Sequence, residues 1–144
     1  MATRRDAREM AMHVLFSIDV CKLDRQEAWE SYFRISEKYD IENIKDFIDE
    51  LIDGTLANMR LIDAEIIKVM TNWDLDRVAA TDRAILRLAV FELFFMDSVP
   101  VNVVINEAVD LAKNFSTPDS GKFVNGVVDK LKDKRGMYER AYTL

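Results

Sequence analysis

The sequence has 144 residues, 49% of them apolar and 32% charged, and a formal net charge of −6. This composition is typical of a globular chain with a sizeable core and excludes wholesale disorder, while the acidic sum excludes a protein that is basic all over. A single cysteine, Cys21, excludes an intrachain disulfide and a multi-cysteine zinc site, and without a secretion signal or a membrane-spanning run we expect a cytoplasmic protein.

Apolar residues at helical spacing predict the helices of the N-terminal half. The first helix begins near Thr3, which is placed to cap it, and continues to about Val20. A second amphipathic stretch covers about Gln26 to Tyr39. From Ile44 to Val69 the same period continues through Gly54, which predicts two helices joined near 57–60 or one long bent helix.

Three further helices are predicted in the C-terminal half. The first of them is apolar on nearly every face, which indicates a central, buried position. Between the second and the third, capping residues and a proline suited to a first helical turn predict a stop and a restart. After a short helical turn at 73–77, these helices cover about Thr81 or Asp82 to Met96, Val101 to Phe115, and a last stretch that follows the restart signal at 116–120 and continues to about Lys134.

The sequence lacks the motifs of catalysis. His13 is the only histidine and has no nucleophile signature nearby, so we interpret it as a surface or edge-of-core imidazole. The glycines are isolated and form no phosphate-binding loop. Asp49 with Asp53, and Asp46 with Glu50, are one helical turn apart, but without a Glu-x-x-His motif they indicate a solvated acidic face rather than a metal site. We therefore expect no cofactor, no metal and no enzyme activity.

Positive charge gathers at the two ends of the chain, although the total is acidic. In the first helix Arg4, Arg5 and Arg8 fall within the first turns, where the helix dipole does not favour arginine. Near the start of the last helix, Lys122 and Phe123 combine a cation with an aromatic ring that can stack a nucleic-acid base. From local chemistry alone, Phe123 is equally well explained as a core residue, and Gly126 as a close contact between two helices.

Several short blocks follow one another along the chain. They are Arg4-Arg5-x-Ala7-Arg8-Glu9 with Leu15-Phe16, Trp73-x-Leu75-x-Arg77, Asp82 to Ala89, Glu92-Leu93, Val99-Pro100, Val104 to Ala108, Leu111-Ala112-Lys113, and Lys122 to Val127. In order and in spacing, these blocks resemble the NusB family of bacterial transcription antitermination factors. The resemblance covers nearly the whole chain, and its specificity comes from the number of blocks rather than from any one of them.

The resemblance implies an all-α fold of about seven helices in two packed three-helix subdomains. We place the N-terminal subdomain at about 1–72, the C-terminal one at about 73–134, and a loose tail at 135–144. It also implies an RNA-binding protein that pairs with NusE, a small-subunit ribosomal protein, binds the boxA element of ribosomal transcripts and joins an antitermination complex with RNA polymerase. Self-association of the free protein, which would mask the arginine face, is left open.

Site residues are carried over by matching positions. Phe16 stands where some relatives have tyrosine, and Asp6 stands where some have a further arginine, which predicts weaker phosphate binding. The positions that match RNA contacts are Arg4, Arg5, Arg8, Asp119, Lys122 and Phe123, and those that match the NusE surface are Phe16 and Asp82.

Two other functions are compatible with the same residues. The first is a purely protein-binding helical adaptor, in which the terminal basic residues only add solubility. The second is a detached module of an RNA methyltransferase, because similar domains occur fused to such enzymes, although a glycine-rich cofactor loop is absent from this sequence. RNA titration separates the first from the antitermination reading, and cofactor binding would support the second.

Overall fold

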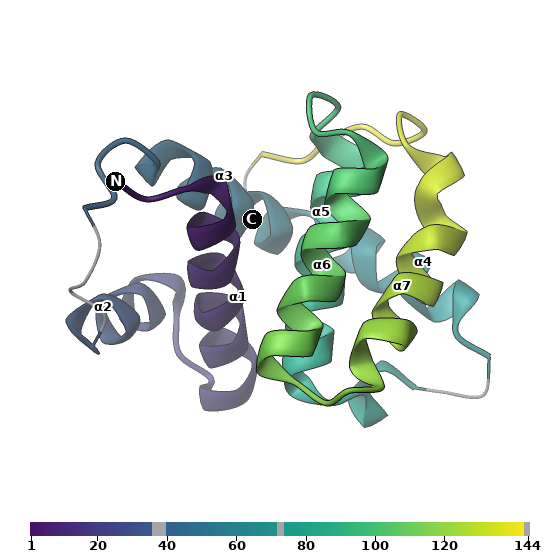
Figure 1. Ribbon diagram of the computed structural model, residues 1–144, viewed down its shortest axis with the longest axis horizontal. Coiled ribbons are helices and arrows are strands. Elements are labelled where there is room, and N and C mark those ends of the chain that lie inside the picture. Colours follow the sequence, from purple (N-terminus) through teal and green to yellow (C-terminus); the bar gives the residue numbers. More distant parts are fainter. Residues whose placement is uncertain (36–39, 72–73, 143–144) are drawn as a thin grey trace.

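The computed structural model describes residues 1–35, 40–71 and 74–142. In that part of the chain it contains seven α-helices, two short 3-10 helices and no strand (Figure 1). The α-helices are α1 (Arg4–Cys21), α2 (Arg25–Ile35), α3 (Lys45–Ala57), α4 (Met59–Val69), α5 (Ala80–Phe95), α6 (Val101–Phe115) and α7 (Ser120–Leu131), and the 3-10 helices are η1 (Leu75–Arg77) and η2 (Lys132–Lys134). The expected all-α fold is confirmed.

Helix α1 is capped as its sequence predicts. The Thr3 hydroxyl accepts a hydrogen bond from the Asp6 backbone N–H, and the Asp6 carboxylate accepts one from the Thr3 backbone N–H, which completes a capping box. At its other end the chain turns at Lys22, whose φ of 56° lies in the left-handed region. The second predicted helix is observed as α2, and its expected end at Tyr39 lies outside the described residues.

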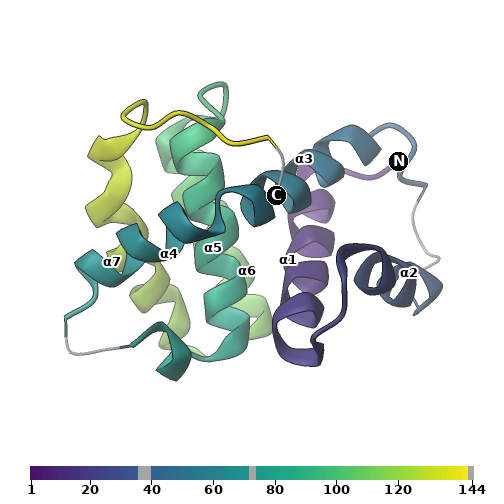
Figure 2. The same ribbon diagram turned by 180° about the vertical axis from the view of Figure 1, so that it is seen from behind.

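Helix α5 is the centre of the fold, as its apolar sequence predicts. It packs against α1, α3, α4, α6 and α7, and both views show it enclosed by them (Figures 1 and 2). It begins at Ala80, one to two residues before the expected start at Thr81 or Asp82, and both of these residues lie inside its first turn. Helix α4 contacts α5 and α7, and by packing it belongs with the C-terminal helices although it precedes residue 72.

The segment after Ile44 forms two helices, which decides between the two alternatives. They meet at Asn58, whose backbone N–H and side-chain amide both donate to the Gly54 carbonyl, at 3.1 and 2.7 Å. The break is not at Gly54, where α3 is continuous. A Cβ at Gly54 would lie 2.2 Å from the Phe91 ring, so this glycine permits α3 and α5 to approach closely.

Residues 135–142 are bound to the helices, contrary to the loose tail that we expected. The Arg135 guanidinium donates to backbone carbonyls at the end of α5 and in the connection that follows it, among them those of Leu93 and Val99. Further along, Arg140 pairs with Glu50 of α3. The side chain of Asn58 donates to the Ala141 carbonyl and accepts a hydrogen bond from the Ala141 N–H. Figure 2 shows this segment reaching α3. Charged side chains that bind distant backbone carbonyls leave no periodic signal in the sequence.

No helix in the described ranges is long and apolar enough to cross a membrane.

Candidate nucleic-acid interface

The three arginines at the start of α1 have different environments. The guanidinium of Arg4 is exposed and lies 4.5 Å from the centroid of the Phe47 ring, and that of Arg8 lies 5.5 Å from the same centroid. Arg8 is only 4% exposed, and its guanidinium donates to both carboxylate oxygens of Glu92 at 2.9–3.0 Å. Burial raises the pKa of Glu92, and Arg8 partly offsets that effect. Arg8 is therefore bound inside the protein and separated from solvent.

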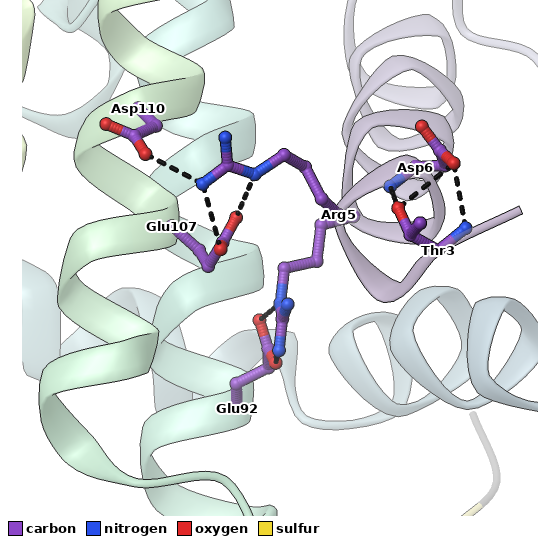
Figure 3. Close-up of polar contacts among 7 residues, drawn as sticks. Thr3, Arg5, Asp6, Glu92, Glu107 and Asp110 are labelled. Atoms are coloured by element: carbon purple, nitrogen blue, oxygen red, sulfur yellow. Dashed lines mark hydrogen bonds and ion pairs between the residues drawn. The ribbon is translucent and has the colours of Figure 1, made fainter.

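Arg5 points outward, toward α6. Its side chain is 58% exposed, and it donates to both oxygens of Glu107 at 3.0–3.1 Å and to Asp110 at 2.9 Å (Figure 3). The hydrogen bonds and charge of Glu107 raise the pKa of Arg5 above its ordinary value. This exposed arginine of α1 is therefore already shared with two carboxylates.

At the start of α7, the candidate residues are not bound by ion pairs within the described part of the chain. Lys122 is exposed and makes no hydrogen bond or ion pair with any described residue. Beside it, Phe123 is half-buried and packs against the core, while it also lines two neighbouring clefts. Asp119 precedes the helix, is exposed, and makes no side-chain capping bond. Phe123 is therefore anchored in the core and also borders open clefts.

Phe123 lines both of these clefts. One, with a volume of about 360 Å³, lies between the start of α7 and the segment around η1, and is lined by Arg77, Val78, Ala79, Asp82, Thr117, Asp119, Ser120 and Phe123. The other, of about 270 Å³, lies between the end of α4 and α7, and is lined by Val69, Met70, Thr71, Lys122, Phe123, Gly126, Val127 and Lys130.

The two residues expected at a protein partner's surface lie near the start of α5. Phe16 is half-buried and lines a small cavity of about 210 Å³ with Thr81 and His13. Asp82 is 7% exposed; one carboxylate oxygen accepts a hydrogen bond from the Ser120 hydroxyl at 2.9 Å, and the other is buried without a partner among the described residues. The carboxylate of Asp82 therefore joins α5 to α7, and only Phe16 offers a partly exposed surface.

His13 is an edge-of-core residue. Its ring stacks on Tyr32 at 5.3 Å and meets the edge of Phe115 at 5.1 Å between centroids. Burial lowers its pKa, which favours the neutral imidazole. Its surroundings are those of an aromatic packing residue.

The structure does not bring the two basic regions into contact. Helix α6 lies between α1 and α7 in both views (Figures 1 and 2). A ligand that touches both regions has to cross α6, which requires an extended molecule.

The family model of the NusB family matches residues 5–133. The chain belongs to the NusB family. It is 44% identical to the transcription antitermination protein NusB of Bacillus licheniformis over 90% of this chain and 95% of that protein, and 43% identical to that of Bacillus subtilis over 90% and 94%.

Solved structures of NusB proteins have the same fold. One from T. maritima has a TM-score of 0.84 and 33% identity, with 93% of each chain covered. A crystal structure of the antitermination factors NusB and NusE in complex with dsRNA has a TM-score of 0.81 and 28% identity, with 90% of this chain and 96% of that chain covered.

Two cations near Phe123 were not predicted from the sequence as site residues. Arg77 and Lys130 each line a cleft beside Phe123, and neither has an ion pair among the described residues. Nothing in the sequence distinguishes such a cation from Lys132, which pairs with Asp129 at 2.9 Å. Whether a lysine is paired depends on the fold, so this signal appears only in three dimensions.

Two of the acidic residues of α3, Asp49 and Asp53, face basic partners. Arg25 donates to Asp49 at 2.6 Å and to Asp53 at 2.9 Å, and Asp49 also pairs with Lys45. Within the described ranges, no group of three or more histidine, cysteine, aspartate or glutamate residues is arranged to hold a metal ion. These carboxylates connect α2 to α3, which is a structural role.

Proposed function

We propose that this protein is an RNA-binding transcription antitermination factor that pairs with NusE and binds boxA RNA of ribosomal transcripts. Its relatives are named transcription antitermination proteins, and one similar solved complex joins NusB, NusE and RNA. In this role it binds and does not catalyse, and it works in the cytoplasm with RNA polymerase.

The observation that carries the proposal is the start of α7. Single-stranded RNA is held by cations on its phosphates and by aromatic rings that stack on its unpaired bases. Lys122 supplies an exposed cation that no described carboxylate neutralises, and Phe123 supplies a ring fixed by the core but bordered by open clefts. A ring that is already immobile loses little conformational entropy when a base stacks on it.

Arg4 and Arg5 form the second part of the RNA site in this proposal. Both are exposed, and Arg5 exchanges Glu107 and Asp110 for a phosphate when RNA arrives. Arg8 has a different task, because its buried pair with Glu92 holds α1 against α5. Asp119 lines the cleft beside Phe123, where its negative charge opposes a phosphate and limits the affinity.

NusE pairing is assigned to the surface around Phe16. The half-buried ring borders a cavity at the start of α5, and the adjoining Asp82 fixes that start against α7 through Ser120. In this arrangement Asp82 positions the surface. A partner bound there extends the RNA surface, so that NusE and RNA strengthen each other's binding.

An RNA titration tests the proposal. Labelled boxA RNA is titrated with the protein, with and without NusE, over a range of salt concentrations. Lys122→Ala is expected to lower the slope of log affinity against log salt by about 0.7, the value for one single-strand phosphate contact. Phe123→Leu, which keeps a core side chain but removes the aromatic face, is expected to weaken binding about 5-fold or more.

Lys132→Ala is the matched control, since it removes an exposed lysine that is paired with Asp129. Unchanged RNA binding in both Lys122→Ala and Phe123→Leu, together with normal NusE pairing, would support a purely protein-binding adaptor instead.

A further inference from the structure

Gly126 has no structural reason to be a glycine. It lies in the interior of α7, where glycine costs about 1 kcal/mol relative to alanine. The usual compensation is close packing, as at Gly54, where a Cβ would collide with Phe91. At Gly126 a Cβ would meet no heavy atom of the described residues within 4 Å apart from its chain neighbours and the nearby backbone of its own helix. The expected helix-to-helix contact at Gly126 is therefore absent, and the flat backbone there faces outward.

Two lysines flank this glycine on the same face of α7. Lys122 is four residues before it and Lys130 four residues after it, so one helical stripe carries a cation, a bare backbone and a second cation. The two lysines are about 12 Å apart along the helix axis. Both are exposed, and neither is paired with a described residue. The carboxylate next to Lys130 in the sequence, that of Asp129, is bound by Lys132.

The same stripe borders the cleft of about 270 Å³ between α4 and α7. Its other wall is the end of α4 and the residues after it, Val69, Met70 and Thr71, which bring no charge. Phe123 lies at the edge of this cleft, so the cleft is continuous with the stacking surface at the start of α7.

We propose that the backbone of single-stranded RNA crosses α7 at Gly126, with phosphates on Lys122 and Lys130 and a nucleotide in the cleft against α4. This inference rests on the proposed function and extends its RNA site beyond Phe123. A side chain at position 126 would hold the sugar-phosphate chain away from the helix, and glycine allows it to approach. Lys130 is then an RNA-binding residue that lies two turns beyond the motif at 122–123.

Charge favours RNA over a protein partner on this stripe. The ligand has to offer negative charge at two points separated by two helical turns, with a flat group between them. A phosphodiester chain repeats its charge regularly and its sugars and bases are flat or thin, which fits that spacing. The faces of the neighbouring wall are apolar or uncharged, so they accept a base without electrostatic cost.

The decisive experiment compares five single variants in the boxA titration described above, each with its melting temperature. Gly126→Ala is expected to raise the melting temperature by about 2–4 °C, because alanine stabilises the helix, and yet to weaken RNA binding about 3-fold. Gly126→Leu, which fills the cleft, is expected to weaken binding about 10-fold or more. Lys130→Ala is expected to lower the salt slope by about 0.7. Higher stability with lower affinity is a combination that a structural role does not produce.

The controls are Asn125→Leu, on the same helix but lining neither cleft, and Lys132→Ala; both are expected to bind RNA as the wild type does. Wild-type binding by Gly126→Leu and Lys130→Ala would overturn the inference, and if Lys122→Ala and Phe123→Leu still weaken binding, the proposed function survives it. Loss of NusE pairing but not of RNA binding in Gly126→Leu would also overturn it, since the stripe would then be a protein surface.

Discussion

The two basic regions of this molecule differ in what their charges already bind. At the start of α1, Arg8 is buried against Glu92 and Arg5 is shared by Glu107 and Asp110. Along α7, Lys122 and Lys130 have no partner among the described residues. The α1 region is thus partly neutralised by its own protein, whereas the α7 region is open to an anion.

This difference teaches that equal charge in the sequence does not mean equal availability. The carboxylates that neutralise α1 come from α5 and α6, 84 to 105 residues away in the chain. Paired cations are expected to contribute to stability and unpaired ones to binding. The three predictions below test that division.

The largest effect is expected for Arg8→Ala. It leaves Glu92 buried without its partner, which typically costs about 3–5 kcal/mol in the free energy of unfolding. Urea denaturation measures this loss. The double variant Arg8→Met with Glu92→Met is expected to recover most of it, because a buried ion pair can be replaced by apolar side chains. A stable Arg8→Ala protein that has lost RNA affinity would place Arg8 among the RNA contacts instead.

A second prediction concerns the paired cations near the end of the chain. Glu65 is buried and accepts hydrogen bonds from Lys134, Tyr138 and Lys68; these hold its pKa at about 2 against the opposing effect of burial. Because the folded pKa is below the ordinary value of 4.5, the stabilisation is present above pH 4.5 and is lost as pH falls toward 2.

We expect that loss to be about 2 kcal/mol after allowance for solvent near the lysines. Denaturation at a series of pH values measures it, and Glu65→Gln should flatten the curve between pH 4.5 and 2. An equally steep curve in that variant would assign the acid sensitivity to other carboxylates.

The smallest effect is expected on RNA affinity when the two carboxylate partners of Arg5 are removed. Glu107→Gln with Asp110→Asn removes both of its partners, so RNA no longer competes with them, and affinity should rise about 2-fold to 5-fold. Asp97→Asn with Glu139→Gln is the matched control, because it changes the net charge equally at exposed residues outside α1, α6 and α7. An equal rise in the control would mean that only the overall charge matters, and the difference between the two regions would lose its functional meaning.

The helices were predictable because each depends on local periodicity. The apolar surface of α5 gave its central position, and Thr3 with Asp6 gave the start of α1. The break at Asn58 was not decided by sequence, since the apolar period continues through it. The bound tail was missed because Arg135 acts on carbonyls that are distant in sequence.

The candidate site was predictable as a set of residue types but not as a geometry. Lys122 and Phe123 are noticeable as neighbours, and the family resemblance points to them. Arg8 can be buried because Glu92 pairs with it, and Gly126 is open because no neighbouring helix in the described ranges packs over it. Both are consequences of packing between helices, for which a single sequence carries no local signal.

The contacts of Arg135 also bear on how the protein folds as it is synthesised. Arg135 completes the end of α5, yet it follows Leu93 by 42 residues and Val99 by 36. Helices form in about a microsecond, whereas a ribosome adds about 5–20 residues per second. For several seconds the nascent central helix therefore lacks the charged donor that binds the carbonyls at its end. The final closure of the core waits for the last tenth of the chain to be translated.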